Sequence, residues 1–251
     1  MSGAFSLAGD ESIDSSSFAL RFAHVIDVFI LYVNLNYPEI FRKNKRRYSS
    51  LLDFIKIGMT AVEVLVKILE NYPEIETVSF YVYKPHLNAG EASEIPTTER
   101  LLFHDSPSDV VDVSREDITV ENLNHSISHL SRNETLAVLS SVKKGDELYH
   151  IPMMDFSCQE SPEGLAKIET FLKEIRYENC AILTSGRSYH FYGFCLINEK
   201  DWLRFLGDCL LSGLVEARYI GHRLRDSNTM GILRLSACPL RPKVPTVVSI
   251  L

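Results

Sequence analysis

The residues best suited to chemistry occupy one short polar stretch, residues 185–190, which reads Ser-Gly-Arg-Ser-Tyr-His. The apolar run 181–183 precedes it and aromatic residues follow it, so we expect a turn between two strands. In such a turn a glycine lets the backbone approach a ligand closely, while an arginine and a histidine offer donors to a phosphate. The pattern predicts either a phosphate-binding turn or a hairpin turn whose polar residues only face water. The phosphate-binding candidates are Ser185, Gly186, Arg187, Ser188 and His190.

Two further segments fit the same chemistry. Asp155 lies at the end of an apolar run, where its carboxylate could hold a divalent metal at a sheet edge, or else cap the helix that follows. Arg234 stands between two leucines of an expected strand, so its side chain must point away from the core, into a cleft or onto the solvated sheet face. For His150 and His222 a structural role at strand ends is favoured over metal binding.

Composition limits the classes of function. The chain has 251 residues, is 45% apolar and carries a net charge of −7, so it can bury a large core but offers nucleic acid no global positive field. The segment 215–251 reverses this balance and favours an anionic ligand. Its basic residues are Arg218, Arg223, Arg225, Arg234, Arg241 and Lys243, against Glu216 and Asp226.

Cysteine usage and hydropathy indicate a cytoplasmic protein without a membrane segment. The five cysteines are widely spaced and odd in number, which argues for free thiols in a reducing compartment. Residues 18–33 are apolar, but Arg21, His24 and Asp27 interrupt them, so they predict a buried helix. The basic cluster 42–47 could contact a nucleic-acid backbone, although a solvated face between helices is favoured.

Periodicity predicts an α+β fold in three parts: an N-terminal helical or α/β region at 1–105, a polar connecting segment at 106–134, and a core domain at 135–251. The core domain reads as ββ, α, ββ, α, β, which suits an antiparallel-rich sheet covered by two helices on one face. The expected helices are 18–33, 51–69, 115–130, 161–175 and 199–214; the expected strands are 77–83, 136–142, 147–156, 181–183, 189–194 and 231–236.

Three motifs, taken in order, resemble the catalytic core of the archaeo-eukaryotic primase (primase–polymerase) superfamily. In that family a first strand carries two acids with one residue between them, a second motif reads Ser-x-His or Ser-Gly-Arg-Gly-Tyr-His, and a third acid follows. An arginine-containing strand comes near the end. Here residues 185–190 match the second motif with Ser188 in place of glycine, and residues 233–236 (Leu-Arg-Leu-Ser) match the last. The resemblance covers residues 135–249 and implies a primase-like core with an RRM-like sheet.

The resemblance also implies roles for single residues. Asp155, Glu216 and His190 would be catalytic, and Asp155 and Glu216 would hold Mg²⁺ or Mn²⁺, with Asp208 and Asp226 as alternatives to Glu216. Arg234 would join the phosphate-binding set. Ser157 stands where the family has its second acid, and because a neutral hydroxyl is a poor metal ligand, two metals are not expected.

Three hypotheses follow from the resemblance. The first is a degenerate primase-like protein that binds a nucleoside triphosphate or nucleic acid, together with partner proteins, in bacterial DNA metabolism, mobile-element function or antiphage defence. The second is an active DNA primase–polymerase, a nucleotidyltransferase that uses Asp155 and Glu216. The third is a non-catalytic scaffold for protein interactions.

Overall fold

A computed structural model of the chain describes residues 51–83, 110–225, 230–239 and 241–251. The expected helix at 18–33, the basic cluster at 42–47 and Asp226 lie outside the described residues. The division into three parts stays a prediction.

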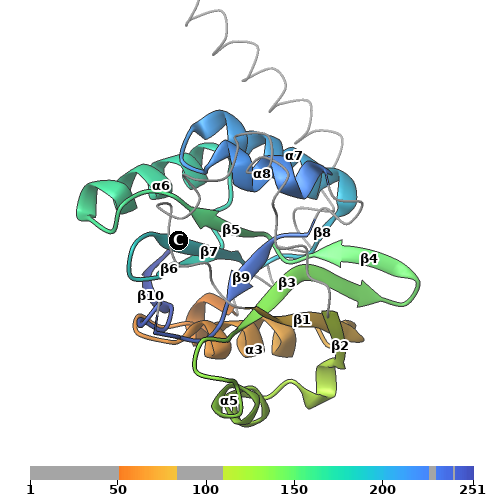
Figure 1. Ribbon diagram of the computed structural model, residues 1–251. Coiled ribbons are helices and arrows are strands. Elements are labelled where there is room, and N and C mark those ends of the chain that lie inside the picture. Colours follow the sequence, from red (N-terminus) through yellow and green to blue (C-terminus); the bar gives the residue numbers. More distant parts are fainter. Residues whose placement is uncertain (1–50, 84–109, 226–229, 240) are drawn as a thin grey trace, which may run out of the picture. The chain divides into compact units, whose positions relative to one another are not determined.

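The described strands form two antiparallel sheets (Figure 1). The first has the order β2-β1-β3-β4-β8, with β9 pairing β3, and the second has the order β10-β6-β7-β5. The sheets approach each other where β5 contacts β9. The strands of the first sheet are β1 (Thr77–Tyr83), β2 (Val110–Ser114), β3 (Thr135–Lys144), β4 (Glu147–His150), β8 (Ile197–Asn198) and β9 (Ile232–Arg234); those of the second are β5 (Met153–Phe156), β6 (Cys180–Thr184), β7 (Tyr189–Gly193) and β10 (Thr246–Ile250).

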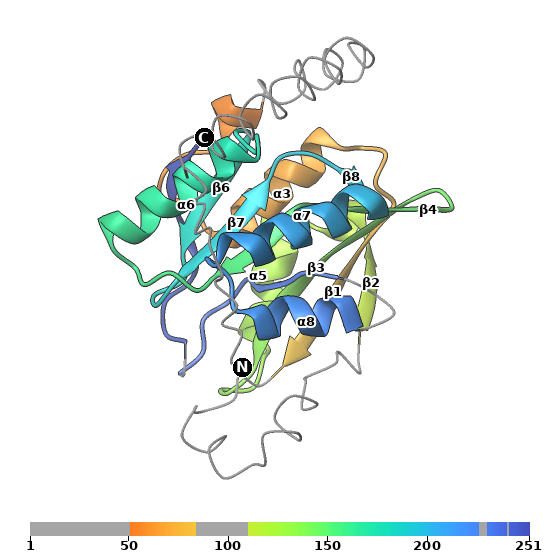
Figure 2. The same ribbon diagram turned by 90° about the horizontal axis from the view of Figure 1, so that it is seen from above.

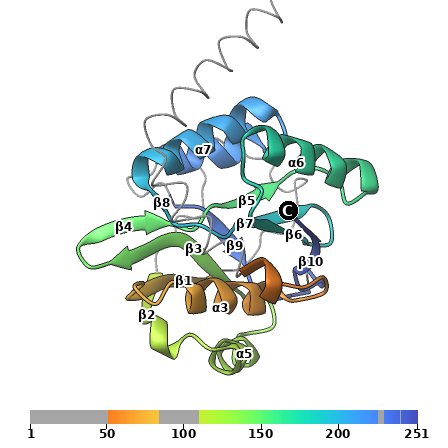
Figure 3. The same ribbon diagram turned by 180° about the vertical axis from the view of Figure 1, so that it is seen from behind.

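Helices cover both sides of the sheets. The helices α6 (Pro162–Glu174), α7 (Glu199–Ser212) and α8 (Ala217–Arg225) lie on one side, and α3 (Ala61–Asn71) and α5 (Val120–Ser128) lie on the other (Figures 1 and 3). A short 3-10 turn, η2 (Arg115–Asp117), precedes α5. No helix among the described residues is long and apolar enough to cross a membrane.

Two large apolar clusters fill the spaces between these layers. One joins α3 to β1, β3 and one face of the second sheet, and includes Leu65, Ile68 and Tyr192. The other lies between the opposite face of the second sheet and α6 and α7, and includes Phe191 and Trp202. Because residues alternate between the faces of a strand, Tyr192 and Phe191 enter different clusters.

The α+β class with antiparallel sheets covered by helices is confirmed, but there are two sheets where the sequence predicts one. The expected strand 147–156 breaks at Ile151 and Pro152. Its first half, β4, stays paired with β3, while its second half, β5, pairs with β7. Proline has no N–H for a strand ladder, and here its carbonyl accepts a hydrogen bond from Gly193 N at 2.8 Å. The break places Asp155 in the same sheet as the polar turn.

The predicted long helix at 51–69 is also interrupted. Residues 51–54 are helical, and α3 begins only after Thr60. Gly58 has a φ of 90° between them, a conformation outside the helical range. Thr60 and Glu63 then form a reciprocal capping box that starts α3. An apolar repeat alone did not reveal this local stop.

Two glycines in helices predict opposite effects on stability. A Cβ on Gly164, near the start of α6, would lie 2.3 Å from the backbone oxygen of Gln159, whereas a Cβ on Gly207 in α7 would meet nothing within 4 Å. Gly164→Ala is therefore expected to destabilise the fold by about 1–3 kcal/mol, and Gly207→Ala to stabilise it by about 0.5–1 kcal/mol. Urea denaturation of both variants checks this, and equal effects would contradict the packing at the start of α6.

Candidate functional site

The polar stretch 185–190 forms a tight turn between β6 and β7. Ser185 N donates to the Ser188 carbonyl at 2.9 Å, and Ser185 Oγ donates to the same oxygen at 3.1 Å. Gly186 has a φ of 95°, in the region that favours glycine. Arg187, at the tip, is exposed. The predicted strand–turn–strand is confirmed, and Ser185 shapes the turn through its own hydrogen bonds.

Asp155 lies directly beside this turn because β5 pairs with β7. Asp155 and His190 are partners in the strand register, and His190 Nε2 lies 4.0 Å from Asp155 Oδ1. Ser188 Oγ donates to Asp155 Oδ1 at 3.3 Å. Two residues 35 positions apart in the sequence thus meet through strand pairing.

His190 is a buried, neutral imidazole. Its exposed fraction is 3%, and its Nδ1 has no hydrogen-bond partner. Burial, together with the positive charge of Arg234, lowers the pKa of His190 to about 3. A buried polar atom without a partner costs free energy, so the fold leaves the hydrogen-bonding capacity of this nitrogen unsatisfied.

Asp155 combines partial exposure with a raised pKa. The side chain is 44% exposed, yet the surrounding protein raises the pKa of Asp155 to about 6 by desolvation. The Ser188 hydrogen bond and the charges of Arg234 and Arg241 oppose this shift, and the charge of Glu216 adds to it. The carboxylate is therefore accessible to solvent, and a nearby cation would stabilise its charged form.

Arg234 is buried and donates hydrogen bonds to the backbone of the turn and of two neighbouring segments. Only 5% of the residue is exposed. Its Nη1 donates to the carbonyls of Ser236 and Lys243 at 3.0 and 2.8 Å, and its Nη2 donates to the carbonyl of Ser185. The side chain avoids the leucine-lined core, as expected, but it is engaged by backbone carbonyls and does not face solvent. Its positive charge acts to lower the pKa of both Asp155 and His190.

Two basic residues that were not among the predicted phosphate-binding residues adjoin this turn and Asp155. The Lys243 side chain packs against Gly186, where an added Cβ would lie 3.0 Å from Lys243 Cβ. Lys243 Nζ contacts Glu160 Oε1 at 2.7 Å and Thr184 Oγ1 at 3.3 Å. The charge of Arg241 lowers the pKa of Asp155. In the sequence, Lys243 and Arg241 were indicated only by the excess of basic residues in segment 215–251, which does not single out either residue.

A contact made by Ser157 joins the end of β5 to the segment that contains Glu216. The backbone N and Oγ of Ser157 both donate to the Leu214 carbonyl, at 2.8 and 3.0 Å. Glu216 follows two residues later, exposed, just before α8, and its charge raises the pKa of Asp155. No group of three potential metal ligands occurs in the part of the chain that the structure describes.

Two of the structural interpretations can be decided. Asp155 does not cap the following helix, because the side chain that accepts from the first turn of α6 is Ser161. His150 is structural: it is 1% exposed, its nitrogens contact Ser140 Oγ at 3.0 Å and Glu199 Oε2 at 2.7 Å, and its ring stacks on Trp202.

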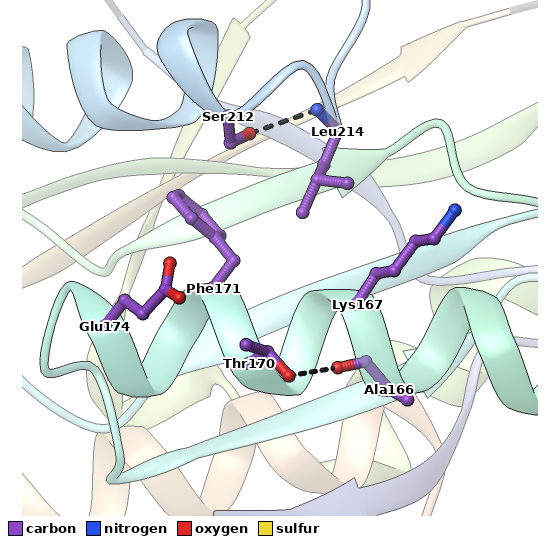
Figure 4. A pocket seen from close by; sticks show the side chains of 7 residues that line it. All are labelled: Ala166, Lys167, Thr170, Phe171, Glu174, Ser212 and Leu214. Atoms are coloured by element: carbon purple, nitrogen blue, oxygen red, sulfur yellow. Dashed lines mark hydrogen bonds between the residues drawn. The ribbon is translucent and has the colours of Figure 1, made fainter. Parts of the chain in front are cut away.

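A hollow of about 420 Å³ lies elsewhere, between α6 and the end of α7 (Figure 4). Its lining residues are Ala166, Lys167, Thr170, Phe171, Glu174, Ser212 and Leu214. None of the predicted site residues lines it, so the hollow does not coincide with the polar turn.

The raised pKa of Asp155 predicts a pH-dependent stability difference. The folded state binds the Asp155 proton more tightly than the unfolded state, with a pKa of about 6 against an ordinary 3.8, so ionisation at high pH destabilises the fold. Asp155→Asn is thus expected to melt above the wild type at pH 8, and the gap should close as the pH falls from about 6 to 3.8. His190 is present in both proteins, and its folded-state pKa of about 3 lies below this range. Thermal melts across this range check the prediction, and a gap independent of pH would contradict it.

One comparison with known proteins found a match. The family model described as archaeo-eukaryotic primase 1D-like matches residues 114–246, which contain Asp155, the turn, Glu216 and Arg234. Searches among curated proteins and among solved structures found no match. Because the family model spans more than half of the chain, this protein belongs to the archaeo-eukaryotic primase 1D-like family.

Proposed function

We propose that the site at the β6–β7 turn binds the triphosphate of a nucleotide together with one divalent cation. One observation carries this proposal: strand pairing sets the Asp155 carboxylate 4.0 Å from the buried His190 imidazole, whose second nitrogen has no partner. A carboxylate for a cation and a neutral donor for a phosphate are thereby held side by side.

Each residue of the turn has a distinct part in this proposal. Arg187 is exposed at the tip and free to swing its guanidinium onto a phosphate. Gly186 brings the backbone close to the ligand, and Ser188 can turn its hydroxyl from Asp155 to a phosphate oxygen. Ser185 and Arg234 keep the turn in shape, and Arg234 adds a positive charge from within the protein.

The donor set fits one Mg²⁺ or Mn²⁺. Asp155 and Glu216 supply carboxylate oxygens, the ligands that these hard cations prefer. The desolvation that raises the pKa of Asp155 would be offset by a bound cation. Two carboxylates are few for a cation, so phosphate oxygens and water would complete the coordination. When bound, the cation would neutralise phosphate charge.

The position of Ser157 supports a site that is degenerate for nucleotidyl transfer. A second acid would be needed there to hold two cations, but the Ser157 hydroxyl instead donates to the Leu214 carbonyl. An active nucleotidyltransferase is the second candidate, favoured by the charge of Glu216, which acts on Asp155. In either case the setting implied by the family resemblance is DNA metabolism or defence, with nucleic acid and protein partners.

A primer-synthesis assay with labelled nucleotides and Mn²⁺ separates the two candidates. The degenerate site is expected to incorporate no more label than Asp155→Asn, while a non-hydrolysable triphosphate still binds. Incorporation by the wild type that disappears in Asp155→Asn would establish the active enzyme instead.

A further inference from the structure

A second buried cation, Arg223, lies on the helix α8. Arg223 is 8% exposed, and its guanidinium carbon lies 4.8 Å from the centre of the Tyr219 ring. Its Nε has no hydrogen-bond partner. Among the described residues no carboxylate forms an ion pair with it, and the sequence of α8 contains no acid.

A buried cation without a counter-charge is costly for the fold. Burial of a charge costs several kcal/mol unless an opposite charge or hydrogen bonds compensate for it. A cation–π contact offsets only part of this cost. Because no described residue supplies the counter-charge, an anionic ligand would complete the arrangement.

Tyr219 contacts both this arginine and the start of β9. Its hydroxyl contacts the backbone O and N of Ile232 at 3.3 Å, two residues before Arg234 on β9. Burial raises the pKa of Tyr219, the charge of Arg223 opposes this shift, and the charge of Asp155 adds to it. Tyr219 therefore contacts Arg223 through its ring and the start of β9 through its hydroxyl.

Two further buried polar side chains, both on β7, have an atom without a hydrogen-bond partner. Tyr192 is fully buried, and its hydroxyl, like Nδ1 of His190 and Nε of Arg223, has no partner. Burial raises the pKa of Tyr192, and the charges at Arg234 and Tyr219 also act on it. The charge of Arg234 acts on both His190 and Tyr192, and Arg223 contacts the Tyr219 ring.

We propose that Arg223 forms a second anion site, under α8, which takes a phosphate group distinct from the triphosphate at the β6–β7 turn. This inference rests on the proposed function, because it adds a second phosphate to the nucleotide that the β6–β7 turn would bind. The phosphate could belong to a nucleic-acid strand or to a second nucleotide. Figure 2 shows α8 beside α7, the helix that supplies a control residue.

The test uses the full chain, a fluorescent single-stranded oligothymidylate and a non-hydrolysable triphosphate with Mn²⁺. Arg223→Met is expected to weaken strand binding about tenfold or more and to reduce the slope of log K against log salt by about 0.7, the value for one phosphate contact on a single strand. Arg204→Met removes the same charge from an exposed site on α7 and should change neither. Arg223→Lys should keep the salt slope.

A second arm identifies the source of the phosphate. If Arg223→Met leaves strand binding intact but reduces the triphosphate stoichiometry from two to one, the site belongs to a second nucleotide. Strand and nucleotide binding equal to those of Arg204→Met would overturn the proposal. If Arg223→Met does not fold, Arg223→Lys decides, and loss of the salt-dependent contact in folded Arg223→Lys also overturns it. Strand binding that needs Arg223 while no triphosphate binds at all would refute the proposed function and leave this inference standing.

Discussion

Replacement of Arg234 by methionine is expected to destabilise the fold by about 2–4 kcal/mol, because it leaves three carbonyls without their shared donor. The carbonyls belong to Ser185, Ser236 and Lys243, and so to three separate segments. Arg234→Lys should recover little of this loss, since an ammonium is a point charge and cannot reproduce the planar fork of a guanidinium.

Urea denaturation measures this effect, and the chain offers a suitable probe. Trp202 is its one tryptophan and is fully buried in the cluster under α7, so its fluorescence reports unfolding. Arg204→Met, which removes an exposed arginine, is the control. If Arg234→Met unfolds at the same urea concentration as the control, the arginine does not hold the turn, and its assignment fails.

Asp155→Asn is expected to weaken Mn²⁺-dependent triphosphate binding by about 100-fold. Loss of residues that merely support metal ligands costs 10–100-fold in affinity, and Asp155 is assigned as a ligand itself. Asparagine keeps the shape and can still accept the Ser188 hydrogen bond, so the loss would report the charge. Fluorescence titration with a labelled, non-hydrolysable triphosphate measures the affinity.

Asp208→Asn provides the matched control for this prediction. Asp208 is an alternative third acid by sequence, but in the structure its charge acts on Cys209 in α7, where it adds to the raised pKa of that thiol. Its replacement should leave Mn²⁺-dependent binding unchanged. A loss as large as that of Asp155→Asn would move the cation site away from the turn.

Local pattern was enough to predict the turn, its flanking strands and the helices α6 and α7. Each is encoded by neighbours in sequence: an apolar period, a proline at the first position of a helix, a glycine where φ is positive. The strand β1 was predicted from alternation in the same way. The edge strand β2 was missed because its three valines lie in a polar, acidic stretch.

The pairing of strands that are distant in the sequence could not be predicted from local patterns. The register that joins Asp155 to His190 depends on β5 leaving the first sheet at Pro152, and no local period records that choice. The same holds for Lys243, whose side chain meets Gly186 from 57 residues away. The family motifs placed Asp155, His190 and Arg234 in one site. Strand pairing joins Asp155 to His190, and a hydrogen bond to the Ser185 carbonyl joins Arg234 to the turn.

The most direct test of the central claim is a crystal structure of the chain with Mn²⁺ and a non-hydrolysable nucleoside triphosphate. One anomalous manganese peak is expected between Asp155 and Glu216, with the triphosphate on residues 185–188 and an oxygen within hydrogen-bond distance of His190. A triphosphate bound elsewhere, or a manganese peak that does not contact Asp155, would contradict the account.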